Sequence, residues 1–454
     1  MPKKSKKSRS APRGGLLTYE LTAIADLKPA ECNVRKHSAR QIANLKRSVM
    51  AFGLVSPVVR DSENRIVAGH GRVEAAKRAG LTEVPTLLLD KLNDQQRRLF
   101  AIADNVIAEQ ASWDEGLLAL ELQDLQLKVP DLDLSLSGLS HSMIDLSIAR
   151  LTQTDWSDLD NCPEEIPTAP MTRIGDVWDF PGGHTLVCGD CTDAAVVSTA
   201  VGDERIRLVA TDPPFNRPAK DYSSKGRFKH DEFVMGAGEM SQEGFRAFLA
   251  ASFEAVRLTL IDGALIYAFM DGQHIADLIE AGEHAGFNHK TVITWDKGTA
   301  GLGGMYRSAT EFIALFKLGK APHVNTIPET RKLGRDRQTI WRYPGMNQFS
   351  KGRERALSWH ATIKPVQMLC DLILDASHRG ARVYDGFGGS GSTLVAAEKV
   401  SRRASLVEID PRYCDVAIER FRLAFGAEPT ERTTGMSFRE RTEAVAIASE
   451  RGDG

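Results

Sequence analysis

One short segment of the chain carries side chains suited to holding an amine. It is Asp212-Pro213-Pro214-Phe215, which follows an apolar run over residues 205–211. Two successive prolines cannot continue a paired strand, so we expect a strand that ends there with Asp212 at its carboxyl end. A carboxylate and a fixed carbonyl accept hydrogen bonds from an exocyclic amine, and an aromatic ring stacks on a base. The tetrapeptide could therefore hold an amine while its nitrogen attacks an electrophilic methyl group.

A second segment is suited to binding a cofactor. Residues 383–393 form a glycine-rich turn between an apolar stretch and a helix-like run. Such a turn lets a ligand approach the backbone, and a helix amino terminus favours negative charge. Taken alone, the glycines fit a structural turn of any α/β domain equally well. Glu408, which ends the next apolar strand about twenty residues later, favours an adenosine cofactor because a carboxylate there accepts hydrogen bonds from both ribose hydroxyls.

Together the two segments resemble the catalytic tetrapeptide and the cofactor loop of the DNA amino-methyltransferases. Members of that family use S-adenosylmethionine to methylate adenine N6 or cytosine N4. The tetrapeptide precedes the loop, which is the order of the beta group, and the resemblance covers roughly residues 173–425. The HPTQKP segment of that group is matched by His360, Thr362, Lys364 and Pro365. The chain departs from the usual Pro at Ala361 and at Gly386, and from the usual Tyr or Trp at Phe215.

The resemblance implies a set of site residues and the cofactor S-adenosyl-L-methionine. The implied catalytic residues are Asp212, Pro213, Pro214 and Phe215. The implied cofactor-binding residues are Asp190, Lys364, Asp385, Phe387, Gly388, Gly389, Ser390, Gly391 and Glu408. We expect no metal: Cys188 and Cys191 form a CxxC without a second pair of ligands, so buried thiols are favoured over zinc.

Residues 296–360 lie where this family carries its target-recognition region. They hold twelve basic side chains against five acidic ones, with glycines and aromatics interleaved. Basic loops contact phosphates, and Arg, Asn and Gln read base edges. On composition alone, a solvated charged loop is the alternative. We expect DNA contacts from Arg331, Lys332, Arg335, Arg337, Arg342, Lys351 and Arg353.

The implied activity is site-specific methylation of adenine N6 in DNA. An Asp at the first position of the tetrapeptide favours adenine in this resemblance, whereas a Ser is commoner in cytosine-N4 enzymes. A duplex hides the target amine, so we expect a flipped base. Cytosine-N4 methylation is one alternative, and a non-catalytic ParB-like DNA-binding or partition protein is another. Methylation of RNA or of a protein amide is disfavoured by the motif order and the basic region.

The amino-terminal third resembles the N-terminal domain of the ParB partition family. The matching residues are Asn33-Val34-Arg35, Gly53 through Pro57, and Ala68 through Arg72. That family handles nucleotide phosphates with a glycine-arginine box, which implies a ParB-like site at Arg35, Gly69, His70, Gly71 and Arg72. The family's GERR box reads Gly-His-Gly-Arg here, so an accessory domain that contacts DNA or dimerises is favoured over an active nucleotide site.

The elements that position these residues divide the 454-residue chain into five parts. We expect a disordered basic tail in residues 1–15, a ParB-like domain with a helical extension in 16–150, an acidic linker in 151–172, the methyltransferase domain in 173–428 and a polar tail in 429–454. The fold class is α/β: a Rossmann-like methyltransferase sheet, preceded by a small α+β domain of the ParB/sulfiredoxin-like kind. Within that small domain, Ile42, Leu45 and Val49 predict a helix that ends at Gly53.

Composition indicates a globular protein. Hydrophobic residues make up 42% and charged residues 26% of the chain, and no stretch reaches the ~20 apolar residues of a membrane helix. A net charge of −2 argues against a histone-like coat of nucleic acid. Six cysteines in so long a chain favour a reducing compartment. We expect a cytoplasmic protein that binds double-stranded DNA and no membrane; a homodimer and a cognate restriction endonuclease stay open.

Overall fold

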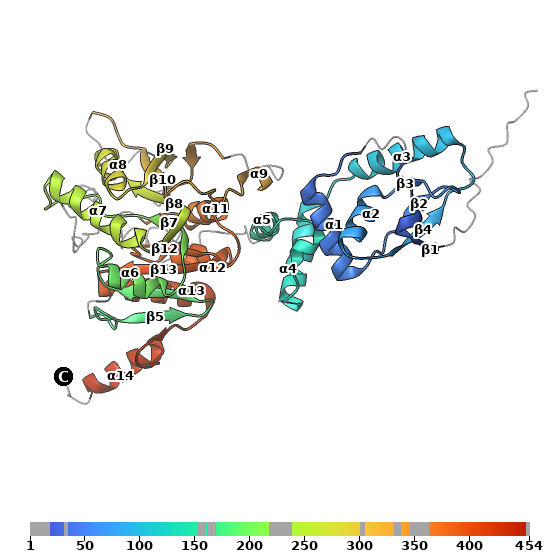
Figure 1. Cartoon of the computed structure of the whole chain (residues 1–454). Coiled ribbons are helices and arrows are strands. Elements are labelled where there is room, and N and C mark those ends of the chain that lie inside the picture. The colour runs from blue at the N-terminus through green and yellow to red at the C-terminus, as the bar shows by residue number, and fades with distance from the viewer. Residues whose placement is uncertain are drawn as a thin grey trace, which may run out of the picture. The chain divides into compact units, whose positions relative to one another are not determined.

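The computed structural model describes most of the chain, in two compact units that comprise Met1–Ser140 and His141–Gly454 (Figure 1). The described residues are 19–30, 35–129, 131–151, 160, 163, 167, 169–217, 238–299, 305–330, 337–345 and 363–450. Among them, no helix combines the length and the apolar character needed to cross a bilayer.

The first unit is a small α+β domain, as predicted. Its strands are β1 (Tyr19–Ala23), β2 (Val58–Arg60), β3 (Ile66–Ala68) and β4 (Glu83–Leu88), in the order β1-β4-β2-β3. Its helices are α1 (Ala39–Phe52), α2 (His70–Arg78), α3 (Asp94–Glu109) and α4 (Glu115–Lys128), with short 3-10 turns η1 (Ile24–Asp26) and η2 (Leu134–Ser137). Helix α1 confirms the sequence pattern: Ser38 caps its amino end, and Gly53, with φ of 77°, ends it.

The second unit is built on a ten-stranded sheet of order β11-β9-β10-β8-β7-β12-β13-β6-β5-β14. The strands are β5 (Val177–Phe180), β6 (His184–Cys188), β7 (Ile206–Thr211), β8 (Leu260–Met270), β9 (Asn288–Asp296), β10 (Thr310–Lys317), β11 (Ile340–Arg342), β12 (Arg382–Asp385), β13 (Arg403–Glu408) and β14 (Thr430–Glu431). The helices are α5 (His141–Leu151), α6 (Ala194–Val201), α7 (Gln242–Arg257), α8 (Ile275–His284), α9 (Ile327–Thr330), α11 (Val366–Ala376), α12 (Ser392–Lys399), α13 (Pro411–Phe425) and α14 (Phe438–Glu450). The five central strands from β8 to β6 run parallel, which confirms the Rossmann-like α/β class.

Strand β8 shows why helices cover both faces of this sheet. Its Leu265 and Phe269 belong to the core that α11 and α12 complete, whereas Ala264 and Ile266 belong to the core beside α6, α7 and α8. Successive side chains of a strand point to opposite faces, so a strand buried on both sides is apolar throughout. Figure 1 shows α7 and α8 on one side of the sheet and α11 and α12 on the other.

The strand order reverses between β7 and β12. From β12 the chain passes through α12 to β13 on one side, and from β7 it passes through α7 to β8 on the other. In open α/β sheets, a ligand crevice forms at the carboxyl ends of the strands at such a reversal. Thr211 and Asp385 end β7 and β12, so the tetrapeptide and the glycine turn leave the sheet from neighbouring strands.

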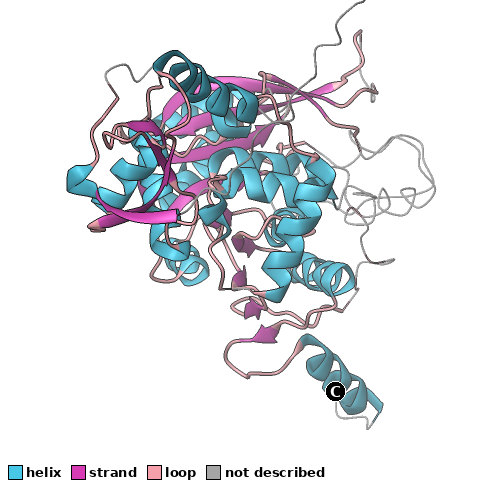
Figure 2. Cartoon of the chain, turned by 90° about the vertical axis from the view of Figure 1, so that its right-hand side faces the viewer, coloured by secondary structure: helices cyan, strands magenta, loops and turns pink. Residues whose placement is uncertain are grey.

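Two domain boundaries differ from the expected ones. Helix α5 groups with the second unit and not with the ParB-like unit, because Asp145 forms a buried ion pair with Arg402. The polar segment that begins at residue 429 is anchored to the second unit. Strand β14 pairs with β5, and Phe438 is only 8% exposed and packs against the ring of Trp178. The chain end that carries α14 is marked in Figure 2.

Candidate functional site

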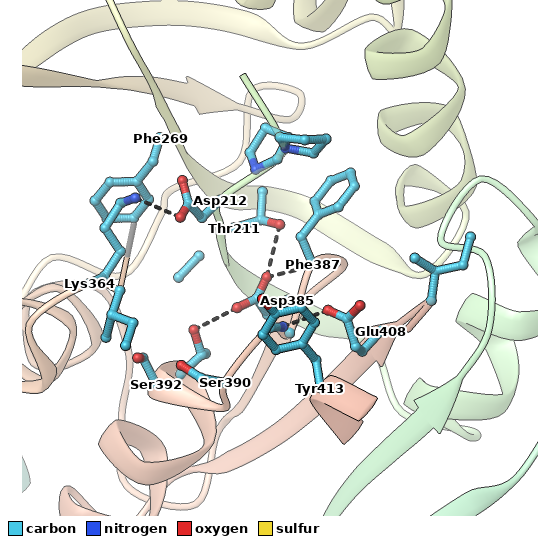
Figure 3. Close-up of a pocket in the computed structure, with 18 of the residues that line it drawn as sticks. Thr211, Asp212, Phe269, Lys364, Asp385, Phe387, Ser390, Ser392, Glu408 and Tyr413 are labelled. Carbon is cyan, nitrogen blue, oxygen red and sulfur yellow. Dashed lines mark hydrogen bonds and ion pairs between the residues drawn. The ribbon is translucent and has the colours of Figure 1, made fainter. Parts of the chain in front are cut away.

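A cavity opens at the carboxyl ends of β7 and β12 (Figure 3). Its empty volume is about 1020 Å³, the part open to solvent included. The cavity brings most of the expected catalytic and cofactor-binding residues together. Those that line it are Asp212, Pro213, Pro214, Phe215, Lys364, Asp385, Phe387, Gly388, Gly389, Ser390 and Glu408.

The two carboxylate oxygens of Asp212 differ: one is hydrogen-bonded, and the other is buried without a donor among the described residues. Its Oδ2 accepts a hydrogen bond of 2.6 Å from Lys364 Nζ, and Figure 3 shows the lysine pointing toward it. Among the described residues, no donor reaches the buried Oδ1. Burial raises the pKa of Asp212 to about 6, with Glu311 adding to the rise and Lys364 opposing it. The group is therefore mainly ionised at neutral pH, with one oxygen able to accept a proton.

The glycine turn fits its surroundings only because it lacks side chains. Gly389 and Gly391 have φ of 48° and 78°, a left-handed conformation that favours glycine. A Cβ on Gly388 would lie 3.1 Å from Leu406 Cδ2, and one on Gly391 would lie 2.9 Å from Ala417 Cβ. Gly391 does not line the cavity; it lets α12 begin close against α13. The turn is thereby held against β13 and α13 with its backbone toward the cavity.

Glu408 binds the glycine turn from the end of β13. Its Oε2 accepts a hydrogen bond of 2.6 Å from Gly389 N, and its Oε1 accepts one of 2.9 Å from Asp410 N. Burial raises the pKa of Glu408 to about 7, although both backbone bonds oppose the rise. A carboxylate accepts up to about four hydrogen bonds, so these two leave capacity for a hydroxyl-bearing ligand.

Asp385 ties β12 to β7 at the base of the cavity. Its Oδ1 accepts a hydrogen bond of 3.0 Å from Thr211 Oγ1 (Figure 3). Its Oδ2 accepts one of 2.6 Å from Thr393 Oγ1. Burial raises the pKa of Asp385 to about 7. The residue fixes the spacing between the tetrapeptide and the glycine turn.

Asp190 does not line the cavity. Thr192 donates to Asp190 Oδ1 from both its backbone N and its Oγ1, each at 2.8 Å, so the carboxylate caps its own turn. Cys188 and Cys191 are buried, at 0% and 6% exposed, and both are free thiols.

Sequence reasoning missed Arg420, which supports the glycine turn from α13. Its side chain is buried, and its Nη1 donates to Ser390 O at 3.2 Å and to Ser392 Oγ at 2.9 Å. The sequence does contain a signal for this role: Arg420 stands on the apolar face of α13, beside the buried residues Ala417 and Phe421. It also missed wall residues supplied by other elements, namely Phe248, Phe269 and Tyr413.

The expected DNA-binding residues fall into three groups. Arg331, Lys332, Arg335, Lys351 and Arg353 lie outside the described residues, as do His360 and Thr362. Arg342 ends β11 with its side chain 71% exposed, 3.8 Å from Asp296. The structure corrects the expectation that Arg337 contacts DNA. Its side chain is only 13% exposed. Its Nε donates a hydrogen bond of 2.8 Å to Asp375, and its Nη1 donates one of 2.7 Å to the hydroxyl of Tyr343. A guanidinium buried in such a network supports the fold and is not placed for phosphate contact.

A second cavity lies within the first unit. All five residues of the expected ParB-like site line it, namely Arg35, Gly69, His70, Gly71 and Arg72, and its empty volume is about 1610 Å³ with its open part included. It lies at the amino end of α2, where Gly69 has φ of 102°. Two of its arginines already have partners within the protein. Arg72 donates a hydrogen bond of 2.5 Å to Pro57 O, and Arg35 forms an ion pair of 3.2 Å with Glu109. Burial lowers the pKa of His70.

Comparisons with known proteins divide the chain in the same way. A sequence profile described as DNA methylase matches residues 206–419, and one described as ParB N-terminal domain matches residues 14–106. The ParB-like nuclease domain-containing protein YnaK of Escherichia coli (strain K12) is 40% identical over 75 residues, 16% of this chain and 86% of that protein.

Relatives of the second unit are methyltransferases. Type II methyltransferase M2.MboI of Moraxella bovis is 27% identical over 141 residues, 30% of this chain and 50% of that protein, so the match spans half of that relative's length. Among solved structures, the PvuII DNA methyltransferase (cytosine-N4-specific) is matched with a TM-score of 0.42 and 17% identity, over 57% of this chain and 90% of that one.

Proposed function

Because the chain belongs to the N6/N4 DNA methylase family and carries a ParB N-terminal domain, we propose that it methylates the exocyclic N6 of adenine at specific sites in double-stranded DNA. One observation carries the proposal. At the reversal of strand order, one cavity is lined by Asp212, the glycine turn and Glu408, and Asp212 Oδ1 has no donor among the described residues.

The cavity fits S-adenosylmethionine, the cofactor of this family. Glu408 would accept hydrogen bonds from the ribose hydroxyls, and Gly388 and Gly389 leave the backbone open to close approach. Phe387 and Tyr413 supply apolar walls. The bound cofactor supplies an electrophilic methyl group on a positively charged sulfur. Because that sulfur is a good leaving group, the protein needs to position the amine more than it needs a strong base.

The tetrapeptide would hold the target amine. Asp212 Oδ1 can accept one amine hydrogen, and the backbone carbonyl of a neighbouring proline can accept the other. Phe215 lines the same cavity and can stack on the base, although it lacks the hydroxyl of the usual tyrosine. As the new N–C bond forms, the amine proton would pass to Asp212.

Adenine is proposed as the target because an Asp begins the tetrapeptide, and cytosine N4 is the second candidate. Either base must leave the duplex to reach a buried carboxylate, and unpairing costs a few kcal/mol. Contacts between the region around Arg342 and phosphates would offset that cost.

A substrate competition tests the proposal. Purified protein, labelled S-adenosylmethionine and equal masses of unmethylated duplex DNA, RNA and mixed protein would be incubated together. We expect label in the DNA alone, and none with Asp212→Asn. Preferential labelling of RNA or protein would contradict the substrate, and no labelling by folded protein would contradict the activity.

For the first unit we propose an accessory role that includes binding of a phosphate-bearing ligand at its cavity. The favourable observation is charge: Arg35, Arg65, Arg72, Arg97 and Arg98 outnumber the lining acids Asp61, Asp94 and Asp104. A helix amino terminus beside them favours an anion. Titration with a panel of nucleoside triphosphates and with duplex DNA, in wild type and Arg72→Ala, tests this. Equal affinities in the two proteins would contradict it.

A further inference from the structure

Lys364 links Asp212 to a second buried acid. The lysine is 4% exposed, and its Nζ lies 2.6 Å from Asp212 Oδ2 and 3.3 Å from Glu311 Oε2. Glu311, on β10, is itself buried, and its Oε1 accepts a hydrogen bond of 3.0 Å from Lys297 Nζ. Four side chains from four separate segments thus form a row of alternating charge, in the order Asp212, Lys364, Glu311, Lys297.

Burying this row of charges lowers the free energy of unfolding unless the charges are well paired. Charges taken out of water lose several kcal/mol each, and well-packed apolar residues often stabilise a core as well or better. Lys364 Nζ also lies 5.3 Å and 5.4 Å from the ring centres of Phe215 and Phe269, so two aromatic rings lie beside the ammonium. The row ends at Asp212, which lines the cavity, and this indicates a use in the site rather than in folding.

The electrostatic consequence concerns Asp212. A lysine alone beside a carboxylate stabilises the ionised form and makes the carboxylate a weaker base. Glu311 Oε2 lies 3.3 Å from the same ammonium and places a second negative charge nearby. It therefore offsets the effect of Lys364 on Asp212, while Lys297 partly balances Glu311.

We propose that Glu311 is a positioning residue for methyl transfer: through Lys364 it fixes the orientation of the Asp212 carboxylate and keeps it basic enough to take the amine proton. This inference rests on the proposed function of the cavity. It assigns a role to a residue of β10, far in sequence from both motifs of the site.

Other charged groups face the same region. Asp385 lies at the end of the neighbouring β12 and is bonded to Thr211 and Thr393. Asp271 follows β8 and pairs with Arg217 at 3.2 Å. Burial raises the pKa of Asp212, Glu311 raises it further and Lys364 lowers it. Because the other acids stay unchanged in each variant below, differences from wild type isolate the row.

The experiment is the pH dependence of kcat/KM in two opposed variants. Glu311→Gln removes the negative charge, so the pKa of Asp212 should fall. The acidic limb of the kcat/KM profile should then move to lower pH by about half a unit or more, and the maximal kcat/KM should be lower. Lys297→Gln leaves Glu311 unbalanced, so the limb should move to higher pH. Lys290→Gln, an exposed lysine on β9, is the matched control and should not move it.

Titration of Asp212 itself gives a second readout that does not need turnover. Protein with ¹³C-labelled aspartate carboxyls would be followed by NMR, with the Asp212 signal assigned by its absence in Asp212→Asn. The titration midpoint should shift in the same two directions. If Glu311→Gln proves unfolded, Glu311→Asp keeps the charge and should hold the midpoint near that of wild type.

The outcomes separate the two proposals. A wild type that transfers no methyl group contradicts the proposed function, while the NMR midpoints still test the row. The inference is overturned if Glu311→Gln is slower but neither the acidic limb of its kcat/KM profile nor the NMR titration midpoint of Asp212 moves. That result would indicate a purely structural role, because such a role lowers activity equally at every pH.

Discussion

Lys364 and Asp212 are 152 positions apart in the chain, yet the lysine Nζ donates a hydrogen bond of 2.6 Å to the aspartate Oδ2. The lysine precedes α11, and Asp212 follows β7, on which α11 packs. The resemblance places Lys364 beside the cofactor. The structure does line the cavity with it, but its ammonium engages the tetrapeptide. Lys364 and the tetrapeptide therefore belong to one site.

Asp212→Asn tests the role of the carboxylate. The amide keeps the shape of the side chain but cannot take up the amine proton, so methyl transfer should fall by about 10²–10⁴-fold. Cofactor affinity, measured by calorimetry, should be unchanged because Glu408 and the glycine turn are intact. Asp203→Asn, at an exposed position after α6, is the matched control. Retained turnover with lost cofactor binding would contradict the assignment.

Gly388→Val tests the cofactor cradle. A Cβ at this position already comes within 3.1 Å of Leu406 Cδ2, so a branched side chain must push the turn into the cavity. Overpacking costs about 1–3 kcal/mol, and if this strain falls on the bound state the affinity drops by about 5- to 150-fold. Calorimetry measures the affinity, and Gly116→Ala in α4, where a Cβ meets its nearest atom at 3.4 Å, is the control. An unchanged cofactor affinity would place the cofactor elsewhere.

The pKa of Glu408 predicts two opposite pH dependences. Burial raises it from 4.5 to about 7, so the folded protein holds a proton that the unfolded chain has lost. The contribution of Glu408 to the free energy of unfolding is full below about pH 4.5 and is lost as pH rises through about 7. Cofactor affinity should rise over the same window, because ribose hydroxyls need the carboxylate.

Denaturant unfolding and cofactor titration at several pH values check this, each as the difference between wild type and Glu408→Gln. Each pKa unit corresponds to about 1.4 kcal/mol. A difference in unfolding free energy that stays constant with pH would show that the carboxyl ionises normally.

The outline of the fold and the centre of the site were predictable from sequence because both depend on local patterns. Prolines end β7 and put Asp212 at its carboxyl end, and glycines mark the turn after β12. Contacts between distant segments were not predictable. Nothing near Glu311 indicates that β10 delivers it to Lys364, and nothing near Arg337 indicates that Asp375 and Tyr343 bind it. Phe438 likewise anchors a segment whose composition is polar, because a single apolar residue meets Trp178.

Arg342 and Arg337 should respond differently to substitution, although both lie in the expected recognition region. Arg342→Ala removes an exposed charge, so DNA affinity should fall and the salt slope of binding should decrease by about one. Arg337→Gln breaks a buried pair, so it should lower the free energy of unfolding by on the order of 3 kcal/mol. Salt-dependent DNA titrations and denaturant unfolding of both variants provide the check. A normal salt slope in Arg342→Ala would move the DNA contact to other residues.

The central claim is tested most directly by identifying the product. Purified protein would be incubated with S-adenosylmethionine and unmethylated duplex DNA of wide sequence coverage, and the digested nucleosides would be resolved by mass spectrometry. We expect N6-methyladenine, in an amount about 10²–10⁴-fold lower with Asp212→Asn. N4-methylcytosine would contradict the target base, and the absence of both products from folded protein would contradict methyl transfer to DNA.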